Sequence, residues 1–393
     1  MKPPAKLTPM RRLACLLLST LPMLATAAPD VDRQLATSLL AISEKRIPEA
    51  LDALDQLTRQ HPNFRLAHLV KGDLLLARAQ PLQTLGNTQG PRSAELEQLR
   101  EEARQRVRAL TDPLPQDTVP AYLLNLDESY RHALVVDASR SRLYVYANRN
   151  GTPIRVADFY VTIGKAGAGK QREGDNRTPI GIYTVSSFKS PRELSDFYGS
   201  GAFTLTYPNE WDTRQGRNGH GIWIHGSPSN TYSRTPLASE GCVVLANDDL
   251  TRLGQYIETG RTPVIIAQQV EWVALNELGA RRSDLATAID RWRQDWESRD
   301  ANRLMSHYGQ HFRAGTQSRE AFAANKHKVN AGKTWIKVGL DRVSLMLYPE
   351  RPDFAMVSFV QHYQSNNLSD RTVKRQFWSR ENGRWTIIHE TTL

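Results

Sequence analysis

Two segments, Gly221-Ile222-Trp223-Ile224-His225-Gly226-Ser227 and Ser239-Glu240-Gly241-Cys242-Val243-Val244-Leu245, decide how the middle of this chain folds. The first is a short β-strand pattern ending at His225, where a side chain can leave a sheet and face a cleft. In the second, Gly241 permits an unusual turn directly before Cys242, and an apolar strand follows. The two segments therefore predict an imidazole and a thiol that meet at strand ends.

An imidazole beside a thiol is a chemically useful pair. A thiolate forms when a nearby imidazole takes the thiol proton, which the imidazole can later return to a leaving amine. The neutral ring needs an acceptor for its other nitrogen, and the carbonyl of Gly226 suits that role because glycine has no side chain. Backbone N–H groups around Gly241 and Cys242 would then face the oxyanion of a tetrahedral intermediate.

The amino terminus has the pattern of an export signal. Basic residues precede an apolar run from Leu13 to Leu24, and the small-x-small triplet Ala25-Thr26-Ala27 follows. We expect cleavage after Ala27, which removes residues 1–27 as a signal peptide. The alternative is a retained anchor, but the apolar run is too short to span a bilayer comfortably.

Export changes the meaning of the two cysteines. Cys15 lies inside the signal, so the mature chain keeps Cys242 alone and cannot form an internal disulfide. Cys242 is then either a small buried hydrophobic residue or a nucleophile. Its neighbours favour the nucleophile.

The charge balance argues against nucleic acid as a partner. Lys and Arg number 51 against 41 Asp and Glu, a formal net charge of +10. Four of the positive charges lie in the first dozen residues, and no basic block carries the mild excess that remains. Such a surface suits an anionic polymer, for example a cell wall.

Apolar periodicity divides the chain into three parts. Residues 28–112 repeat apolar residues at helical spacing and resemble about one and a half tetratricopeptide-type hairpins, fewer than the roughly three that stand alone. This helical part should pack on a second copy or on the rest of the chain. Prolines mark a linker over 113–129. Many short strands with one late helix then predict a β-rich sandwich or barrel over 130–268.

The tail, residues 280–393, begins with helices and continues as an antiparallel meander. This pattern resembles the cone-shaped nuclear-transport-factor-2-like fold, whose members hold a pocket and act as enzymes or, more often, as binding or assembly modules. We interpret His307, His311 and His389 as structural or surface histidines. The predicted fold class is thus a multidomain α+β chain.

Two patterns suggest cofactors but are incomplete. Gly164-Lys-Ala-Gly-Ala-Gly169-Lys170 matches most of a phosphate-binding loop, yet Gln171 replaces the magnesium-binding hydroxyl and no apolar helix follows. His220, His225 and Cys242 might converge on a metal, but no HExxH or CxxC spacing exists. We predict no nucleotide, no metal and no other cofactor.

The reactive segments resemble a known family. His225-Gly226 and Ser239-x-Gly241-Cys242, with sixteen residues between His225 and Cys242, are similar to the L,D-transpeptidase (YkuD-type) catalytic domain. The likeness covers about residues 130–268. Further matching segments are Thr178-Pro179-Ile180-Gly181-Ile182-Tyr183, Tyr207-Pro208-Asn209 and Gly216-Arg217-Asn218-Gly219.

The resemblance implies a cysteine acyl-transfer enzyme of the periplasm. Such a cysteine attacks the carbonyl at the L-centre of meso-diaminopimelate in a peptidoglycan tetrapeptide stem, and D-Ala leaves. By matching position, Cys242 is the nucleophile, His225 the general base and acid, and the Gly226 carbonyl orients His225. The N–H groups of Gly241 and Cys242 would bind the oxyanion.

The resemblance also suggests residues that contact the substrate, but two positions differ from the family motif. Ser239, Tyr207 and Trp223 are expected to contact the stem peptide. Glu240 and Val244 stand where many family members have His and Arg, and that Arg is associated with substrate binding in crosslinking members.

The three-part layout resembles the helical-cell-shape L,D-carboxypeptidase group, so we expect water to resolve the acyl-enzyme. Transpeptidation to an amine is the alternative within the family. A non-catalytic wall-binding scaffold is the alternative outside it. We also predict a homodimer through residues 31–110.

Overall fold

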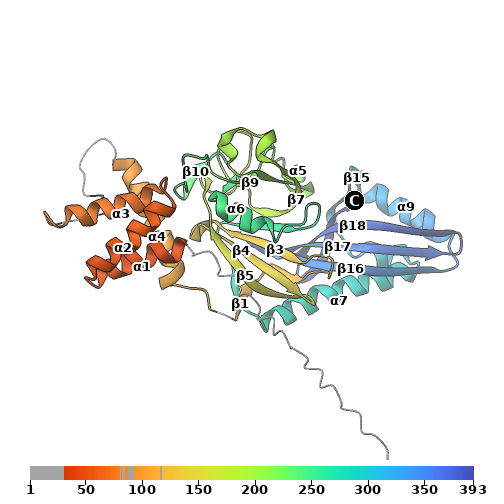
Figure 1. The fold of residues 1–393 in the computed structure, drawn as a ribbon. Helices are drawn as coiled ribbons and strands as arrows, with labels where there is room; N and C mark the ends of the chain where they lie inside the picture. The colour runs from red at the N-terminus through yellow and green to blue at the C-terminus, as the bar shows by residue number, and fades with distance from the viewer. Residues whose placement is uncertain (1–30, 80, 82–84, 87–92, 116) are drawn as a thin grey trace, which may run out of the picture.

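The computed structural model describes residues 31–79, 81, 85–86, 93–115 and 117–393. The predicted signal peptide lies outside these residues. Figure 1 shows a helical unit at one end, a β-rich unit in the middle and a sheet of long strands at the other end, in chain order. The predicted multidomain α+β class is therefore confirmed. Among the described helices, none combines the length and apolarity needed to cross a bilayer.

The helical unit consists of four helices around a small core of its own. Leu35, Leu54, Leu57 and Phe64 are almost completely buried in it, as the apolar spacing of the sequence requires. The helices are α1 (Val31–Ser43), α2 (Ile47–Gln60), α3 (Arg65–Leu76) and α4 (Ser93–Thr111).

This helical unit packs on the rest of the chain, one of the two alternatives left open by the sequence. Arg106 of α4 is buried, pairs with Asp32 of α1 and with Glu102, and lies 3.9 Å above the ring of Tyr160 in the central unit. Asp32 also pairs with Arg142 of the central unit. Burial raises the pKa of Asp32, but the two arginines outweigh that effect and hold it below its usual value.

The central unit is an eight-stranded mixed sheet in the order β11-β9-β8-β7-β12-β3-β4-β5. Alternating apolar residues of these strands, among them Val136, Val145 and Ile224, form its core together with α6. A small parallel pair, β6 with β10, lies beside it. The elements are β3 (His132–Asp137), β4 (Arg142–Arg149), β5 (Thr152–Tyr160), β6 (Ile163–Gly164), β7 (Gly181–Lys189), β8 (Ala202–Leu205), α5 (Glu210–Arg214), β9 (Trp223–His225), β10 (Leu237–Ser239), β11 (Val243–Val244), α6 (Asn247–Gly254) and β12 (Pro263–Ala267).

The segment predicted as a linker over 113–129 is more ordered than expected. β1 (Thr118–Pro120) pairs with β13 (Trp272–Ala274), and β2 (Leu123–Asn125) joins the C-terminal sheet against β16. The sequence prediction relied on the prolines and overlooked the apolar run from Ala121 to Leu124, which is buried in the structure. This segment therefore ties the central unit to the C-terminal unit.

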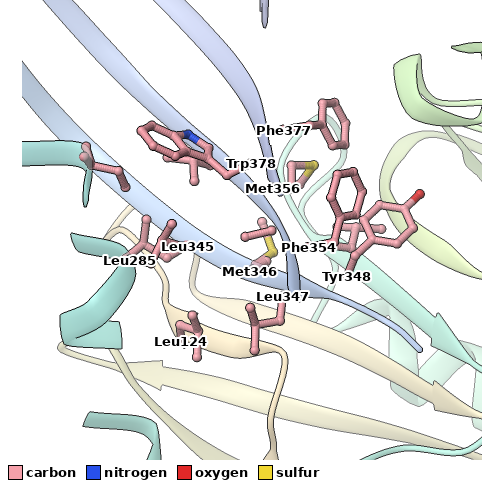
Figure 2. Close-up of a cluster of buried hydrophobic side chains, with 14 of the residues drawn as sticks. Leu124, Leu285, Leu345, Met346, Leu347, Tyr348, Phe354, Met356, Phe377 and Trp378 are labelled. Carbon is pink, nitrogen blue, oxygen red and sulfur yellow. The ribbon is translucent and has the colours of Figure 1, made fainter. Parts of the chain in front are cut away.

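The C-terminal unit is a mostly antiparallel sheet in the order β15-β14-β19-β18-β17-β16-β2, packed against helices, in which β14 pairs with β19 in parallel. Leu124 of β2, Leu285 of α7 and Trp378 of β18 meet in its core (Figure 2). The same core continues through Tyr348 into the central unit. The elements are α7 (Glu277–Glu297), α8 (Ala301–Met305), β14 (Tyr308–Ala314), β15 (Gln317–Ser318), α9 (Arg319–Ala331), β16 (Ile336–Tyr348), β17 (Arg351–Ser365), β18 (Leu368–Glu381) and β19 (Arg384–Thr392).

Candidate active site

The parallel pairing of β9 with β11 brings the two reactive segments together. The register pairs Val243 with Ile224 and Val244 with His225. Cys242 directly precedes β11, and its thiol donates to the carbonyl oxygen of Gly221 at 3.4 Å. The sulfur therefore lies beside the start of the strand that His225 ends.

His225 is held as a neutral base. Its Nδ1 lies 2.7 Å from the carbonyl oxygen of Gly226, so Nδ1 carries the proton and Nε2 keeps its lone pair. The side chain is 1% exposed. Burial lowers the pKa of His225 to about 4; the Gly226 contact opposes this fall and the charge of Arg234 adds to it.

The thiol of Cys242 is shifted in the opposite direction. Burial raises its pKa, while the backbone N–H of Trp223 and the positive charge of Arg234 act against that rise. The shifts of the two pKa values favour a neutral thiol at Cys242 and a neutral imidazole at His225.

An aromatic group closes one side of the site. η3 (Asp196–Tyr198) is a short 3-10 helix whose Tyr198 ring lies 5.0 Å from both the His225 ring and the Trp223 ring. Phe197 lies 5.8 Å from the His225 ring, and Arg234 stacks over Phe197 at 4.6 Å. The sequence did not indicate Phe197, Tyr198 or Arg234, because they lie in loop segments that the matching motifs do not include.

Asn247 connects two loops beside these aromatic side chains. Its Oδ1 accepts from the N–H groups of Ser200 and Ser227, and its Nδ2 donates to the carbonyl oxygen of Ser227. Gly226 needs to be glycine here, since a Cβ would lie 2.1 Å from Asn247 Oδ1. None of the sequence motifs described above includes Asn247.

The turn before the cysteine is shaped by hydroxyl groups. Ser239 Oγ donates to the Cys242 carbonyl oxygen at 2.6 Å and accepts from the Gly241 N–H at 3.1 Å. Thr178 Oγ1 donates to the Gly241 carbonyl oxygen at 3.0 Å. Ser239 is buried and its hydroxyl is engaged within the turn, which does not support the predicted substrate contact. The Gly241 N–H is also occupied, so Cys242 N–H is the stronger oxyanion candidate.

Two further substrate predictions have different outcomes. Tyr207 is buried in the core of the central sheet, and its hydroxyl donates to the Asn218 carbonyl oxygen, so its predicted contact with the stem peptide gains no support from these contacts. Trp223 is partly buried beside Tyr198 at the site. Val244, in the position of the family's Arg, is buried within the sheet.

The segment that resembles a phosphate-binding loop has a structural role. Lys170 is buried and pairs with Asp175, which also accepts from the backbone N–H groups of Gln171 and Arg172. These contacts stabilise the loop itself. His220 is exposed and lies beside Glu173, away from the buried His225.

The C-terminal histidines take varied positions. His307 Nε2 lies 2.7 Å from Asp295 Oδ2, and His311 is exposed. His389 is buried on β19.

Comparisons with known proteins agree with this site. The L,D-transpeptidase catalytic domain (YkuD) matches residues 131–266, and the Cds6 C-terminal NTF2-like domain matches residues 284–391. No curated protein matched.

Two solved structures resemble the chain over most of their length. Bd1075 of Bdellovibrio bacteriovorus is 30% identical with a TM-score of 0.63, covering 70% of this chain and 98% of that one. The helical cell shape determining protein Pgp2 of Campylobacter jejuni has the same fold, at 24% identity and a TM-score of 0.57, covering 73% of this chain and 98% of its own. The chain therefore belongs to the L,D-transpeptidase (YkuD) family of peptidoglycan-acting enzymes and carries a C-terminal NTF2-like domain.

Proposed function

We propose that this protein is a periplasmic L,D-carboxypeptidase that removes D-Ala from tetrapeptide stems of peptidoglycan. The observation that carries the proposal is the β9–β11 pairing, which sets the Cys242 thiol beside the strand of a neutral His225 fixed by Gly226. No metal or other cofactor takes part in the proposed reaction.

The first half of the reaction forms an acyl-enzyme. Nε2 of His225 takes the thiol proton as Sγ of Cys242 attacks the carbonyl carbon of the meso-diaminopimelate–D-Ala bond. The N–H of Cys242 stabilises the oxyanion. The C–N bond breaks, His225 returns the proton to the leaving amine, and a thioester remains on Cys242.

The second half consumes water. His225 takes a proton from a water molecule that attacks the thioester carbonyl, and the C–S bond breaks to release the tripeptide acid. The proton returns to the sulfur, so Cys242 and His225 regain their starting forms. Hydrolysis is supported over crosslinking by Val244, which offers no cation where crosslinking members have Arg.

The similarity to Pgp2, named for helical cell shape determination, supports a role in cell shape. Trimming of stem peptides removes the tetrapeptide donors that crosslinking needs. We propose that the enzyme affects cell shape by removing these tetrapeptide donors.

The test is mass analysis of muropeptides incubated with the chain lacking residues 1–27. Tetrapeptides should become tripeptides with release of D-Ala, and Cys242→Ala and His225→Gln should abolish release. Crosslinked dimers as the main product would instead identify a transpeptidase. Sacculus binding without product, and without a carbapenem adduct on Cys242, would identify a non-catalytic scaffold.

A further inference from the structure

We propose that Arg234 forms the subsite for the terminal carboxylate of the substrate and thereby makes the enzyme select stems that end in a free acid. This inference rests on the proposed function, because the carboxylate in question belongs to the departing D-Ala. Arg234 lies in the loop between β9 and β10, residues 226–236, and no family motif quoted above includes it.

The guanidinium of Arg234 is separated from the His225 ring by one aromatic side chain. It stacks over Phe197, whose ring is next to His225. Its charge acts on both Cys242 and His225, since it opposes the rise in the thiol pKa and adds to the fall in the imidazole pKa. An arginine stacked on an aromatic ring presents its N–H edge for planar, bidentate binding.

No carboxylate of the described residues forms a hydrogen bond or ion pair with the Arg234 side chain. Glu240 is the acidic group that acts on its pKa, and Glu240 Oε1 itself lies 3.5 Å from Lys165 Nζ. Arg234 is partly buried, and burial lowers its pKa. A partly desolvated cation beside a nucleophile is a favourable partner for an anionic group of the substrate.

Several elements hold the backbone of Arg234 in place. Its carbonyl oxygen accepts from Tyr160 Oη at 3.1 Å and from Thr162 Oγ1 at 2.9 Å. The preceding residue, Ser233, donates to Glu102 of α4 at 2.7 Å. The position of the arginine is therefore fixed before substrate arrives.

The helical unit supplies much of this support. Tyr232 packs between His61 and Phe64, with ring centroids 4.5 and 4.6 Å away, and its N–H donates to the Asn63 carbonyl oxygen. Asn63 Nδ2 also donates to the carbonyl oxygen of Ser229. The helical unit thus positions the loop that carries Arg234.

The chemistry of the bond that is cleaved explains the location. Only the amide nitrogen and one Cα separate the scissile carbonyl from the carboxylate of D-Ala, a distance of roughly 4 Å between the two carbon atoms. A cation for that carboxylate must lie close to the reacting groups, and Arg234 is held against Phe197, whose ring neighbours that of His225. Val244 of β11, at the position of the family's Arg, has no charge and cannot bind this carboxylate.

The test compares two substrates, a muropeptide ending in D-Ala and the same muropeptide ending in D-alaninamide. The unmodified protein should process the acid with a kcat/KM roughly 10- to 100-fold higher than the amide, the range of a charge-assisted hydrogen bond. Arg234→Gln should lose activity on the acid and keep its activity on the amide, so the ratio falls to near one. Arg234→Lys should recover part of the preference.

Arg261 provides the matched control, because it is an exposed arginine in the turn before β12. Arg261→Gln should keep the full preference, and thermal unfolding of each variant checks that it folds. An unchanged acid-to-amide ratio in a folded Arg234→Gln protein would overturn the role of Arg234. Absence of D-Ala release from the acid by the unmodified protein would instead overturn the proposed function.

Discussion

Burial moves the pKa values of Cys242 and His225 apart, and this separation predicts how the thiol reacts. The pKa of His225 falls to about 4 and that of Cys242 rises above its usual 9.0. A resting thiolate–imidazolium pair is then strongly disfavoured. The thiol should lose its proton only as it attacks.

The pH dependence of alkylation checks this prediction. The rate of Cys242 modification by iodoacetamide should rise with pH past 9.0, without a plateau in the neutral range. His225→Gln serves as the comparison, since it removes the base and keeps a polar side chain. A rate that is high and independent of pH from roughly 5 to 8 would reveal a preformed thiolate and contradict the neutral pair.

The same shift of His225 makes the fold sensitive to acid. The unfolded chain binds a proton at His225 near pH 6.5, whereas the folded chain resists it until about pH 4. Stability is therefore complete above pH 6.5 and decreases as the pH falls toward 4, by at most about 3 kcal/mol. Urea unfolding across this range should show a shallower decline for His225→Gln than for the unmodified protein.

At the residue scale, the sequence identified groups that act through local spacing. His225, Gly226 and Cys242 could be found because a strand end and a glycine turn are visible in the sequence. Arg234 and Phe197 could not, because their proximity to the cysteine depends on how two loops fold back. The substrate contact of Ser239 stays a prediction, and nothing in the sequence indicated that the serine hydroxyl also closes a turn.

Among the elements, the start of α6 has the largest effect on the shape of the site. Asn247 joins the segment after η3 to the segment after β9 through three hydrogen bonds. Asn247→Ala leaves the N–H of Ser200 without this acceptor, so the unfolding free energy should fall by roughly 1–3 kcal/mol. The D-Ala release rate should also fall, because Asn247 no longer joins the segment that carries Tyr198 to the segment that carries Gly226.

Asn247→Asp distinguishes the role of the Asn247 acceptor, Oδ1, from that of its donor, Nδ2. The aspartate keeps the acceptor for Ser200 and Ser227 and loses the donor to the Ser227 carbonyl oxygen, so its melting temperature should lie between those of Asn247→Ala and the unmodified protein. Equal melting temperatures for all three proteins would show that Asn247 does not hold these loops.

The elements themselves were largely readable from the sequence. The period of two over residues 130–268 predicted strands because one face of each is buried in a core. The segment 113–129 was misjudged, since its prolines hid two short strands that pair with residues far along the chain. Pairing partners at that distance leave no local pattern.

At the scale of the whole molecule, the outer surface of the helical unit bears on the predicted homodimer. Leu40, Leu75 and Leu76 are exposed there, with Leu75 at 47%. Light scattering at micromolar concentration should give about twice the mass of one chain, since shared burial of such residues favours association. Leu75→Glu should weaken the dimer, and Leu368→Glu in the C-terminal unit should not. A single-chain mass for the unmodified protein would contradict the prediction.

The distribution of hydrophobic cores predicts which parts of the chain fold alone. The helical unit has a core separate from the rest, whereas one core runs through the C-terminal unit and into the central sheet, from Trp292 to Tyr146. A chain of residues 113–393 should therefore fold with a cooperative thermal transition. It should also lose much of its preference for the free acid, because the loop around Arg234 loses its contacts with Phe64 and Glu102.

A chain that ends at residue 268 lacks most of the residues of the continuous core. It exposes Tyr146 and Ile265, which pack against the C-terminal unit in the full chain, and should aggregate or melt without cooperativity. Arg375→Gln is the control, because it breaks only the partly exposed ion pair with Glu210 across the same boundary and should cost at most about 1 kcal/mol. A soluble, cooperatively folded product from residues 31–268 would show that the central unit is independent and that the continuous core is not required.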